Sequence, residues 1–139
     1  MPLAELPEWA RELVGEARVA RLALLDDRDL PRVLPVTFAL CECAVWSAID
    51  RKPKRTAEPA RVRRLRRRPE AALLVDRYDE DWSRLAWVEL RGRVGIVAAA
   101  DADAALSALV AKYPQYRDEP PPGPLLRLAV DRATCWRAA

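Results

Sequence analysis

The 139-residue sequence contains no histidine. A chain without histidine cannot form a Ser-His-Asp triad or a Cys-His pair. It also lacks the commonest side-chain ligand of transition metals. Any chemistry performed by this protein is therefore expected to belong to a bound cofactor, with no side chain acting as a nucleophile.

Cysteine is scarce, with three residues at Cys41, Cys43 and Cys135. An odd number without regular spacing argues against a disulfide framework. Zinc usually takes four protein ligands, and here neither a histidine nor a fourth cysteine completes a set. We therefore expect no metal site, and we interpret the cysteines as packed thiols or turn residues.

Long apolar runs and a strong net charge are missing as well. The segment 1–16 is acidic and amphipathic, without the basic and apolar regions of a signal peptide. No apolar run is long enough to cross a membrane. The net charge of +3, from 24 basic and 21 acidic residues, is too even for a dedicated nucleic-acid binder. These absences predict a cytoplasmic protein with neither a membrane nor a nucleic acid as partner.

The length and composition, 51% hydrophobic and 32% charged, are typical of one soluble domain spanning residues 1–139. Alternation and helical spacing predict six strands and three helices, followed after the last helix by an extended proline-rich loop. The first three strands follow one another closely, which favours a mainly β (α+β) fold: a small antiparallel barrel with flanking helices. The expected strands are Arg18–Asp26, Arg32–Leu40, Ala44–Ile49, Ala71–Tyr78, Ala86–Val97 and Leu126–Trp136; the helices are Leu6–Gly15, Pro59–Arg68 and Asp101–Tyr113, and the loop is Gln115–Pro124.

A basic loop, Asp50–Arg55, follows the third expected strand and precedes the second expected helix. Cationic side chains and a helix N-terminus both favour a phosphate group. Pro53 restricts the loop, which lowers the entropy cost of fixing long side chains. On composition alone, a solvated surface turn is the commoner explanation of such a loop. Its cations are Arg51, Lys52, Lys54 and Arg55.

The expected helix Pro59–Arg68 contains six arginines, and only Val62 and Leu65 offer it an apolar stripe. Such a helix could bind nucleic acid, or Arg61 or Arg64 could extend a phosphate site. It could also be a charged outer surface paired with the acidic segment Asp76–Asp81. We favour the surface interpretation for most of these arginines.

The charged connection Asp79–Arg84 mixes carboxylates with Trp82 and Arg84. Neighbouring carboxylates can act as acid and base, but no second, distant partner for them is recognisable. Tryptophans in such a position more often pack a core or a subunit interface than stack on a ligand. The segment alone therefore identifies no catalytic residue.

Several segments together resemble the pyridoxamine 5′-phosphate oxidase-like, FMN-binding split-barrel family. The similarity is greatest to its actinobacterial branch of deazaflavin-dependent (coenzyme F420) enzymes. It covers nearly the whole chain, and its most specific parts are Lys-Pro-Lys and Tyr-Asp-Glu-Asp-Trp-Ser. The segments that carry it are Arg18–Ala23, Val33–Ala39, Ser47–Lys54, Leu73–Ser83 and Lys112–Tyr116.

This resemblance implies a homodimer of six-stranded split barrels with two cofactor sites at the subunit interface. It implies that the tricyclic ring lies along one strand, that the next strand borders the ring and ribityl chain, and that the basic loop meets the phosphate. It also implies that two side chains reach in from the partner subunit. The corresponding residues are Pro35, Val36 and Thr37 for the ring; Ser47, Ala48, Ile49 and Asp50 for its border; Lys52, Lys54, Arg55 and Arg64 for the phosphate; and Trp82 and Arg84 from the partner.

The sequence departs from the family pattern at two turns, Asp27–Asp29 and Cys41–Cys43. Pyridoxal-phosphate-forming members also use histidine near the C-terminus, so vitamin B6 oxidation is not expected here. The resemblance predicts an oxidoreductase that binds coenzyme F420 and transfers hydride to a small-molecule substrate. The alternatives are FMN in the same fold or a cofactor carrier without catalysis. The proton donor would be water or Tyr78.

Overall fold

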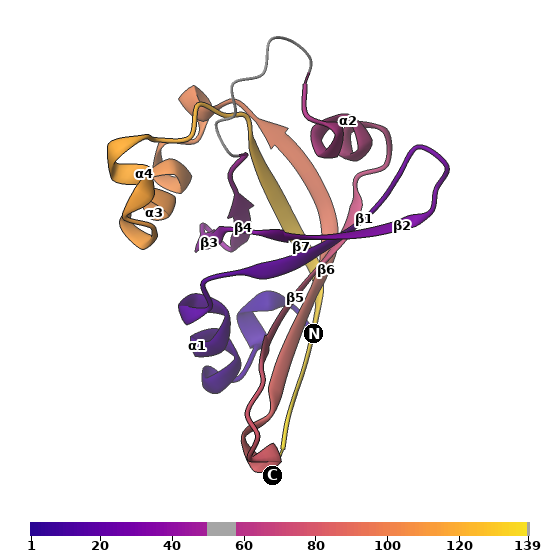
Figure 1. Cartoon of the computed structure of the whole chain (residues 1–139), viewed down its shortest axis with the longest axis vertical. Coiled ribbons are helices and arrows are strands. Elements are labelled where there is room, and N and C mark those ends of the chain that lie inside the picture. The colour runs from indigo at the N-terminus through magenta and orange to yellow at the C-terminus, as the bar shows by residue number, and fades with distance from the viewer. Residues whose placement is uncertain (50–57, 139) are drawn as a thin grey trace.

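The computed structural model describes residues 1–49 and 58–138, and a single curled antiparallel sheet dominates these parts of the chain (Figure 1). Its strand order is β2-β1-β5-β6-β7-β4-β3. The chain passes from β2 to β3 across Thr37 alone, so the two edge strands of the sheet are joined and the sheet closes into a half-barrel. The strands are β1 (Ala20–Leu25), β2 (Pro31–Val36), β3 (Phe38–Cys41), β4 (Ala44–Ser47), β5 (Glu70–Arg77), β6 (Ala86–Val97) and β7 (Leu125–Arg137).

The mainly β architecture with flanking helices is confirmed, but the predicted number of strands is wrong, because the described residues form seven strands. The difference arises in the expected strand Arg32–Leu40, which breaks at Thr37. Its first half, β2, pairs with β1, whereas its second half, β3, pairs with β4. The Thr37 carbonyl accepts a hydrogen bond from the Ser47 hydroxyl and so leaves the regular ladder. Alternation alone could not show that one extended segment serves two neighbours.

The barrel interior is filled by apolar side chains that alternate along the strands. In β1, for example, Ala20, Leu22 and Leu24 are buried. The remaining internal space between β1, β2 and the strands facing them is about 10 Å³, which is at the lower limit for a single water molecule. The interior therefore has no room for a ligand larger than a water molecule.

A bulge interrupts the pairing of β6 with β7 between Arg91 and Gly92. A Cβ atom at Gly92 would overlap the carbonyl oxygen of Ala129 on β7. Only glycine permits the two backbones to approach this closely. At the β3–β4 hairpin, Glu42 and Cys43 both have positive φ, as a tight two-residue turn requires.

The helices cover the barrel in separate places. α1 (Glu8–Glu16) packs on β5 and β6, α2 (Ala60–Arg67) on β1 and β6, and α3 (Asp103–Lys112) on β3 and β4. A fourth helix, α4 (Gln115–Asp118), begins the segment predicted to be extended, so that prediction is wrong for these residues. The described residues also form three short 3₁₀ helices: η1 (Leu3–Glu5), η2 (Trp82–Arg84) and η3 (Ala99–Asp101).

The strands β5, β6 and β7 continue past the barrel as a long arm (Figure 1). The connection between β5 and β6 lies at the tip of this arm, beside the end of β7. α3 and α4 lie together near β3 and β4, at the other end of the molecule. No helix within the described residues has the length and apolar character needed to span a bilayer.

Candidate cofactor site

The strand break at Thr37 and the end of β4 meet at one point, which we call the junction (Val36–Phe38 and Ser47–Ile49). The Ser47 hydroxyl donates a hydrogen bond of 2.7 Å to the Thr37 carbonyl. Ser47 is 5% exposed, and within the described parts of the chain no other polar side chain is as buried. A buried hydroxyl needs a hydrogen-bond partner, so this bond fixes the position of Thr37 relative to β4.

The junction brings together the two segments predicted to border a flavin-type ring. Val36 and Ala48 are buried in the core, so they could present only backbone atoms to a ligand. Thr37 and Ile49 are half-buried, and Pro35 is exposed. The side chains available to a ring outside the barrel are therefore those of Pro35, Thr37 and Ile49.

The predicted phosphate loop leads directly on from the junction in the sequence. Asp50, Lys52, Lys54 and Arg55 lie outside the described residues, so their placement stays a prediction. The chain is described again from Glu58, and α2 starts at Ala60.

Arg64 is the predicted phosphate residue that the structure does describe. It is half-buried on α2, and its Nε atom is buried without a hydrogen-bond partner among the described residues. Nearby, the backbone N–H groups of Leu30 and Arg28 lower the pKa of Asp26, and the charge of Arg64 lowers this pKa further. A buried N–H without an acceptor is a donor that a bound anion would satisfy. Arg64 is therefore a donor that could hold a phosphate group, and this role stays a prediction.

Four other arginines of the predicted helix are already engaged in exposed ion pairs with acidic side chains. The prediction that their partners lie in Asp76–Asp81 is wrong, because the partners come from the β1–β2 turn and from the residues flanking α2. Exposed pairs of this kind contribute little to stability, but they occupy the guanidinium groups. The pairs are Arg63–Asp27 at 3.3 Å, Arg66–Glu58 at 3.0 Å, Arg67–Asp29 at 2.9 Å, Arg68–Asp29 at 3.0 Å and Arg68–Glu70 at 3.0 Å.

The structure does not bring Trp82 and Arg84 to the junction of their own chain. Both belong to η2 at the tip of the arm (Figure 1). Trp82 is 69% exposed, and Arg84 forms an exposed ion pair of 3.3 Å with Asp79. Tyr78, the predicted proton donor, follows β5 in the same region and is 63% exposed.

Tyr113, which follows α3, and Tyr116, on α4, also contact the junction, although the sequence suggested no role for either. The Tyr116 hydroxyl lies 2.7 Å from the Thr37 hydroxyl, and either group can be the donor. The Tyr113 hydroxyl accepts a hydrogen bond of 3.0 Å from the Phe38 N–H and can donate to the Arg18 carbonyl, also at 3.0 Å. The segment Lys112–Tyr116 was part of the family resemblance. Its role depends on α4, which the sequence pattern did not reveal.

A hollow of about 380 Å³ opens beside the junction. The hollow is lined by Thr37, by Arg18 and by three residues from the end of α3 and the start of α4: Tyr113, Gln115 and Tyr116. Its volume lies within the range of small-molecule sites. The hollow shares Thr37 with the predicted ring contact.

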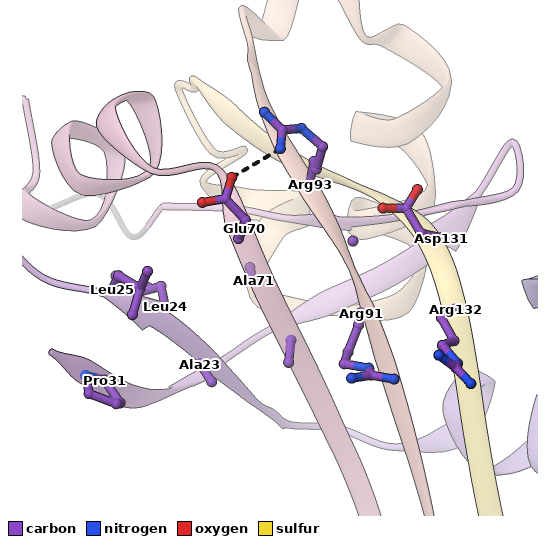
Figure 2. A pocket seen from close by; sticks show the side chains of 12 residues that line it. Ala23, Leu24, Leu25, Pro31, Glu70, Ala71, Arg91, Arg93, Asp131 and Arg132 are labelled. Carbon is purple, nitrogen blue, oxygen red and sulfur yellow. Dashed lines mark hydrogen bonds and ion pairs between the residues drawn. The ribbon is translucent and has the colours of Figure 1, made fainter. Parts of the chain in front are cut away.

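A second, wider hollow of about 570 Å³ lies on the outer surface of β1, β5, β6 and β7 (Figure 2). Ala23, Ala71 and Gly92 make its floor shallow. Arg91 and Arg132 are direct cross-strand partners, and their guanidinium groups lie side by side in Figure 2. Glu70 and Arg93 form a 3.0 Å ion pair at the other end. This surface is separate from the junction residues.

The three cysteines are free thiols. Burial and the neighbouring Glu42 carboxylate raise the pKa of Cys41, which makes this thiol less reactive. No group of three or more histidine, cysteine, aspartate or glutamate side chains within residues 1–49 and 58–138 could hold a metal ion.

Solved structures provide close matches to the fold at low sequence identity. The conserved hypothetical protein Rv2991 from Mycobacterium tuberculosis has a TM-score of 0.78 at 18% identity, over 95% of this chain and 85% of that one. A heme-binding protein from Mycobacterium smegmatis has a TM-score of 0.76 at 20% identity, over 94% of this chain and 53% of that one. An F420 reductase has a TM-score of 0.66 at 20% identity, over 93% of this chain and 98% of that one.

No curated protein matches the chain in sequence. The sequence profile of the pyridoxamine 5′-phosphate oxidase family, however, matches residues 6–137, which is almost the whole chain. This match agrees with the curled antiparallel half-barrel and its flanking helices. The chain therefore belongs to the pyridoxamine 5′-phosphate oxidase family of split-barrel proteins.

Proposed function

We propose that this protein is an oxidoreductase that binds coenzyme F420 at the junction and promotes hydride transfer to a small-molecule substrate. The observation that carries the proposal is the Ser47–Thr37 hydrogen bond of 2.7 Å. This bond aligns the two segments expected to border the ring, immediately before the basic loop expected to hold the phosphate. The F420 reductase with the same fold supports this choice of cofactor.

The chain's own residues would orient the cofactor from outside the barrel. Because the barrel interior is filled, the ring would lie against Pro35, Thr37 and Ile49. Buried Val36 and Ala48 anchor the backbone beneath them in the core. A rigid platform of this kind lowers the entropy cost of reaching a reactive geometry.

The phosphate would be held by cations that follow the junction in sequence. Lys52 and Lys54 are the leading candidates, and Asp50 would border the ribityl chain. Arg55 and the buried Nε–H of Arg64 would add further charge-assisted hydrogen bonds.

A bound deazaflavin supplies hydride, so the protein needs no nucleophile of its own. The absence of histidine agrees with this division of labour. A substrate reduced here receives a hydride at one atom and a proton at another. Within one chain, water or the hydroxyl groups of Thr37 and Tyr116 lie at the junction and could supply that proton, whereas Tyr78 would reach the site only from a second copy.

We further propose that the active form is a homodimer. Trp82 and Arg84 lie far from the junction of their own chain, at the tip of the arm. A second copy would bring them to the site, and the 69% exposure of Trp82 is compatible with an unfilled contact.

FMN is the alternative cofactor in the same fold. The anionic tail of F420 would favour additional cations near the site, but four arginines from position 63 to position 68 already form ion pairs. These arginines therefore give no reason to prefer F420 over FMN. Heme, which one structural neighbour binds, is less compatible with this chain, because histidine is a common axial ligand of heme iron.

The direct test is an equilibrium titration of the purified protein with F420 and, separately, with FMN, followed by cofactor fluorescence. The proposal expects F420 to bind with a dissociation constant of about 10 μM or lower, which corresponds to about −7 kcal/mol. Tight FMN binding without F420 binding would replace the leading proposal by its alternative. Cofactor binding without turnover of any substrate would indicate a carrier.

Charge-removing variants locate the phosphate in the same assay. Replacing both lysines, as Lys52→Gln with Lys54→Gln, should weaken binding by about 100-fold, because two charge-assisted hydrogen bonds are lost. Arg63→Gln is the matched control, since Arg63 is an exposed cation already paired with Asp27. Equal weakening in the control would show that only general charge matters.

A further inference from the structure

Two cations lie at the hollow beside the junction: Arg18 lines it, and Lys112, next to Tyr113, is hydrogen-bonded to Arg18 through its backbone carbonyl. Within the described residues no ion pair involves Arg18 or Lys112. Arg18 instead donates a hydrogen bond of 2.8 Å to the Lys112 carbonyl, and its guanidinium carbon lies 4.8 Å from the centre of the Tyr113 ring. The Lys112 ammonium lies 3.8 Å from the centre of the Phe38 ring. The described ion pairs thus leave both cations out, and the aromatic ring faces beside them attract a cation weakly.

The pKa of Lys112 reflects both its burial and the neighbouring positive charge. Burial first, and then the charge of Arg18, lower the pKa of Lys112 to about 8. A nearby anion would reverse the second effect and compensate part of the first.

Hydroxyl groups complete the lining of the hollow. Thr37 and Tyr116 place two hydroxyls 2.7 Å apart on its wall. The guanidinium group of Arg18 adds several N–H donors in a planar fork that matches a carboxylate. Positive charge, a fork of donors and hydroxyl groups together form a receptor for an anion.

The walls are already held in place. The Tyr113 hydroxyl bonds to the Phe38 backbone. The rings of Tyr113 and Tyr116 are in edge-to-face contact, with their centres 5.6 Å apart. A preorganised site loses less conformational entropy on binding. The hollow of about 380 Å³ is large enough for a small organic acid, whose remaining atoms would extend toward Thr37 and the proposed ring position.

We propose that this hollow binds the carboxylate group of a small organic acid, and that this acid is the substrate of the site. The substrate role rests on the function proposed above, whereas the anion binding does not. One guanidinium with two hydroxyls suits a singly charged group. The phosphate of the cofactor would be held separately, by the loop that follows Ser47–Ile49.

The test uses cinnamate and its neutral amide, cinnamamide, as a pair of probes that differ in charge. Calorimetric titration of the full-length protein should give at least about tenfold tighter binding of cinnamate, because an Arg–carboxylate contact is charge-assisted. Arg18→Gln should abolish this preference, and Arg18→Lys should retain part of it. Arg117→Gln is the matched control, since Arg117 is an exposed arginine on α4 that does not line the hollow, and it should keep the full preference.

A second measurement is independent of substitutions. Cinnamate binding near pH 8 should be accompanied by uptake of up to about half a proton, because an anion raises the pKa of Lys112. Comparing the binding heat in two buffers of different ionisation enthalpy gives this number. The other charged or titratable groups around the hollow are Arg18, Tyr113 and Tyr116, and burial raises the pKa of Tyr113 above its ordinary value.

Equal binding of the two probes to the wild-type protein would overturn the inference, as would an equal loss of preference in Arg117→Gln. Inorganic phosphate binding more tightly than cinnamate would overturn the choice of a carboxylate. Repeating the titration with cofactor-saturated protein separates the two proposals. Unchanged cinnamate binding supports the substrate role, and competition with the cofactor overturns it. Selective cinnamate binding by a protein that binds no cofactor would support the anion site and overturn the proposed function.

Discussion

Tyr113 offers the sharpest test of how the junction is held. Its side chain is 6% exposed, and its hydroxyl accepts a hydrogen bond of 3.0 Å from the Phe38 N–H. The same hydroxyl can donate to the carbonyl of Arg18 at 3.0 Å or to that of Phe38 at 3.1 Å. Tyr113→Phe keeps the ring and removes these bonds. The variant therefore isolates the hydroxyl's contribution to the chain immediately after Thr37.

The expected cost follows from which backbone groups lose a partner. A buried N–H without an acceptor costs about 1–3 kcal/mol, whereas the two carbonyls share one proton and lose less. We therefore expect the free energy of unfolding to fall by about 1–3 kcal/mol in urea titrations. The melting temperature should fall by roughly 3–12 °C for a chain of this length.

Tyr116→Phe is the matched comparison, because it removes the 2.7 Å bond between the Tyr116 and Thr37 hydroxyls. A single neutral hydrogen bond contributes about 0.5–1.5 kcal/mol, so this variant should be the more stable of the two. The explanation is refuted if Tyr113→Phe unfolds within about 0.5 kcal/mol of the wild-type protein. It is equally refuted if Tyr116→Phe is the more damaging change.

Three further predictions concern the bulge, the half-buried lysine and the arm. Gly92→Ala should lower the free energy of unfolding in urea by about 1–3 kcal/mol, because the added methyl group would collide with the Ala129 backbone. Gly95→Ala is the control: a Cβ atom there meets open space, so this variant should be neutral or more stable by about 0.5 kcal/mol. Lys112 has a folded pKa of about 8, below its ordinary 10.5, so between these pH values the unfolded chain binds more protons and the wild type gains stability as pH rises. Any advantage in unfolding free energy of Lys112→Met over the wild type near pH 7 should therefore shrink toward pH 10. A difference that stays constant with pH would contradict this. Trp82→Ala should shift the sedimentation equilibrium toward the monomer. It should leave the melting temperature of the monomer unchanged, because the indole is exposed in the single chain. A dimer unaffected by this change would place the interface elsewhere.

Much of the fold could be predicted because local patterns determined it. The alternation in Ala86–Val97 predicted β6 with the same bounds. The break at Thr37 could not be read from alternation, because it depends on a hydrogen bond from Ser47, ten residues later in the chain. Proline-rich composition likewise concealed the four residues of α4.

The candidate site shows the same division between local and long-range information. The segments around Thr37 and Ser47 were predicted from a family resemblance, and the structure places them side by side. Tyr113 and Tyr116 lie more than seventy residues from the chain they contact, so no local pattern assigned them a role. The arginines of α2 needed three-dimensional information as well, because their acidic partners include the distant β1–β2 turn.

The central claim is that a phosphate-bearing deazaflavin lies outside the barrel, with its ring at the junction and its phosphate on the following loop. A crystal structure of the protein with coenzyme F420 tests this claim most directly. We predict a ring in contact with Pro35, Thr37 or Ile49, and phosphate oxygens within hydrogen-bond distance of Lys52 and Lys54. A cofactor bound instead on the surface of Arg91 and Arg132, with the junction empty, would contradict the account.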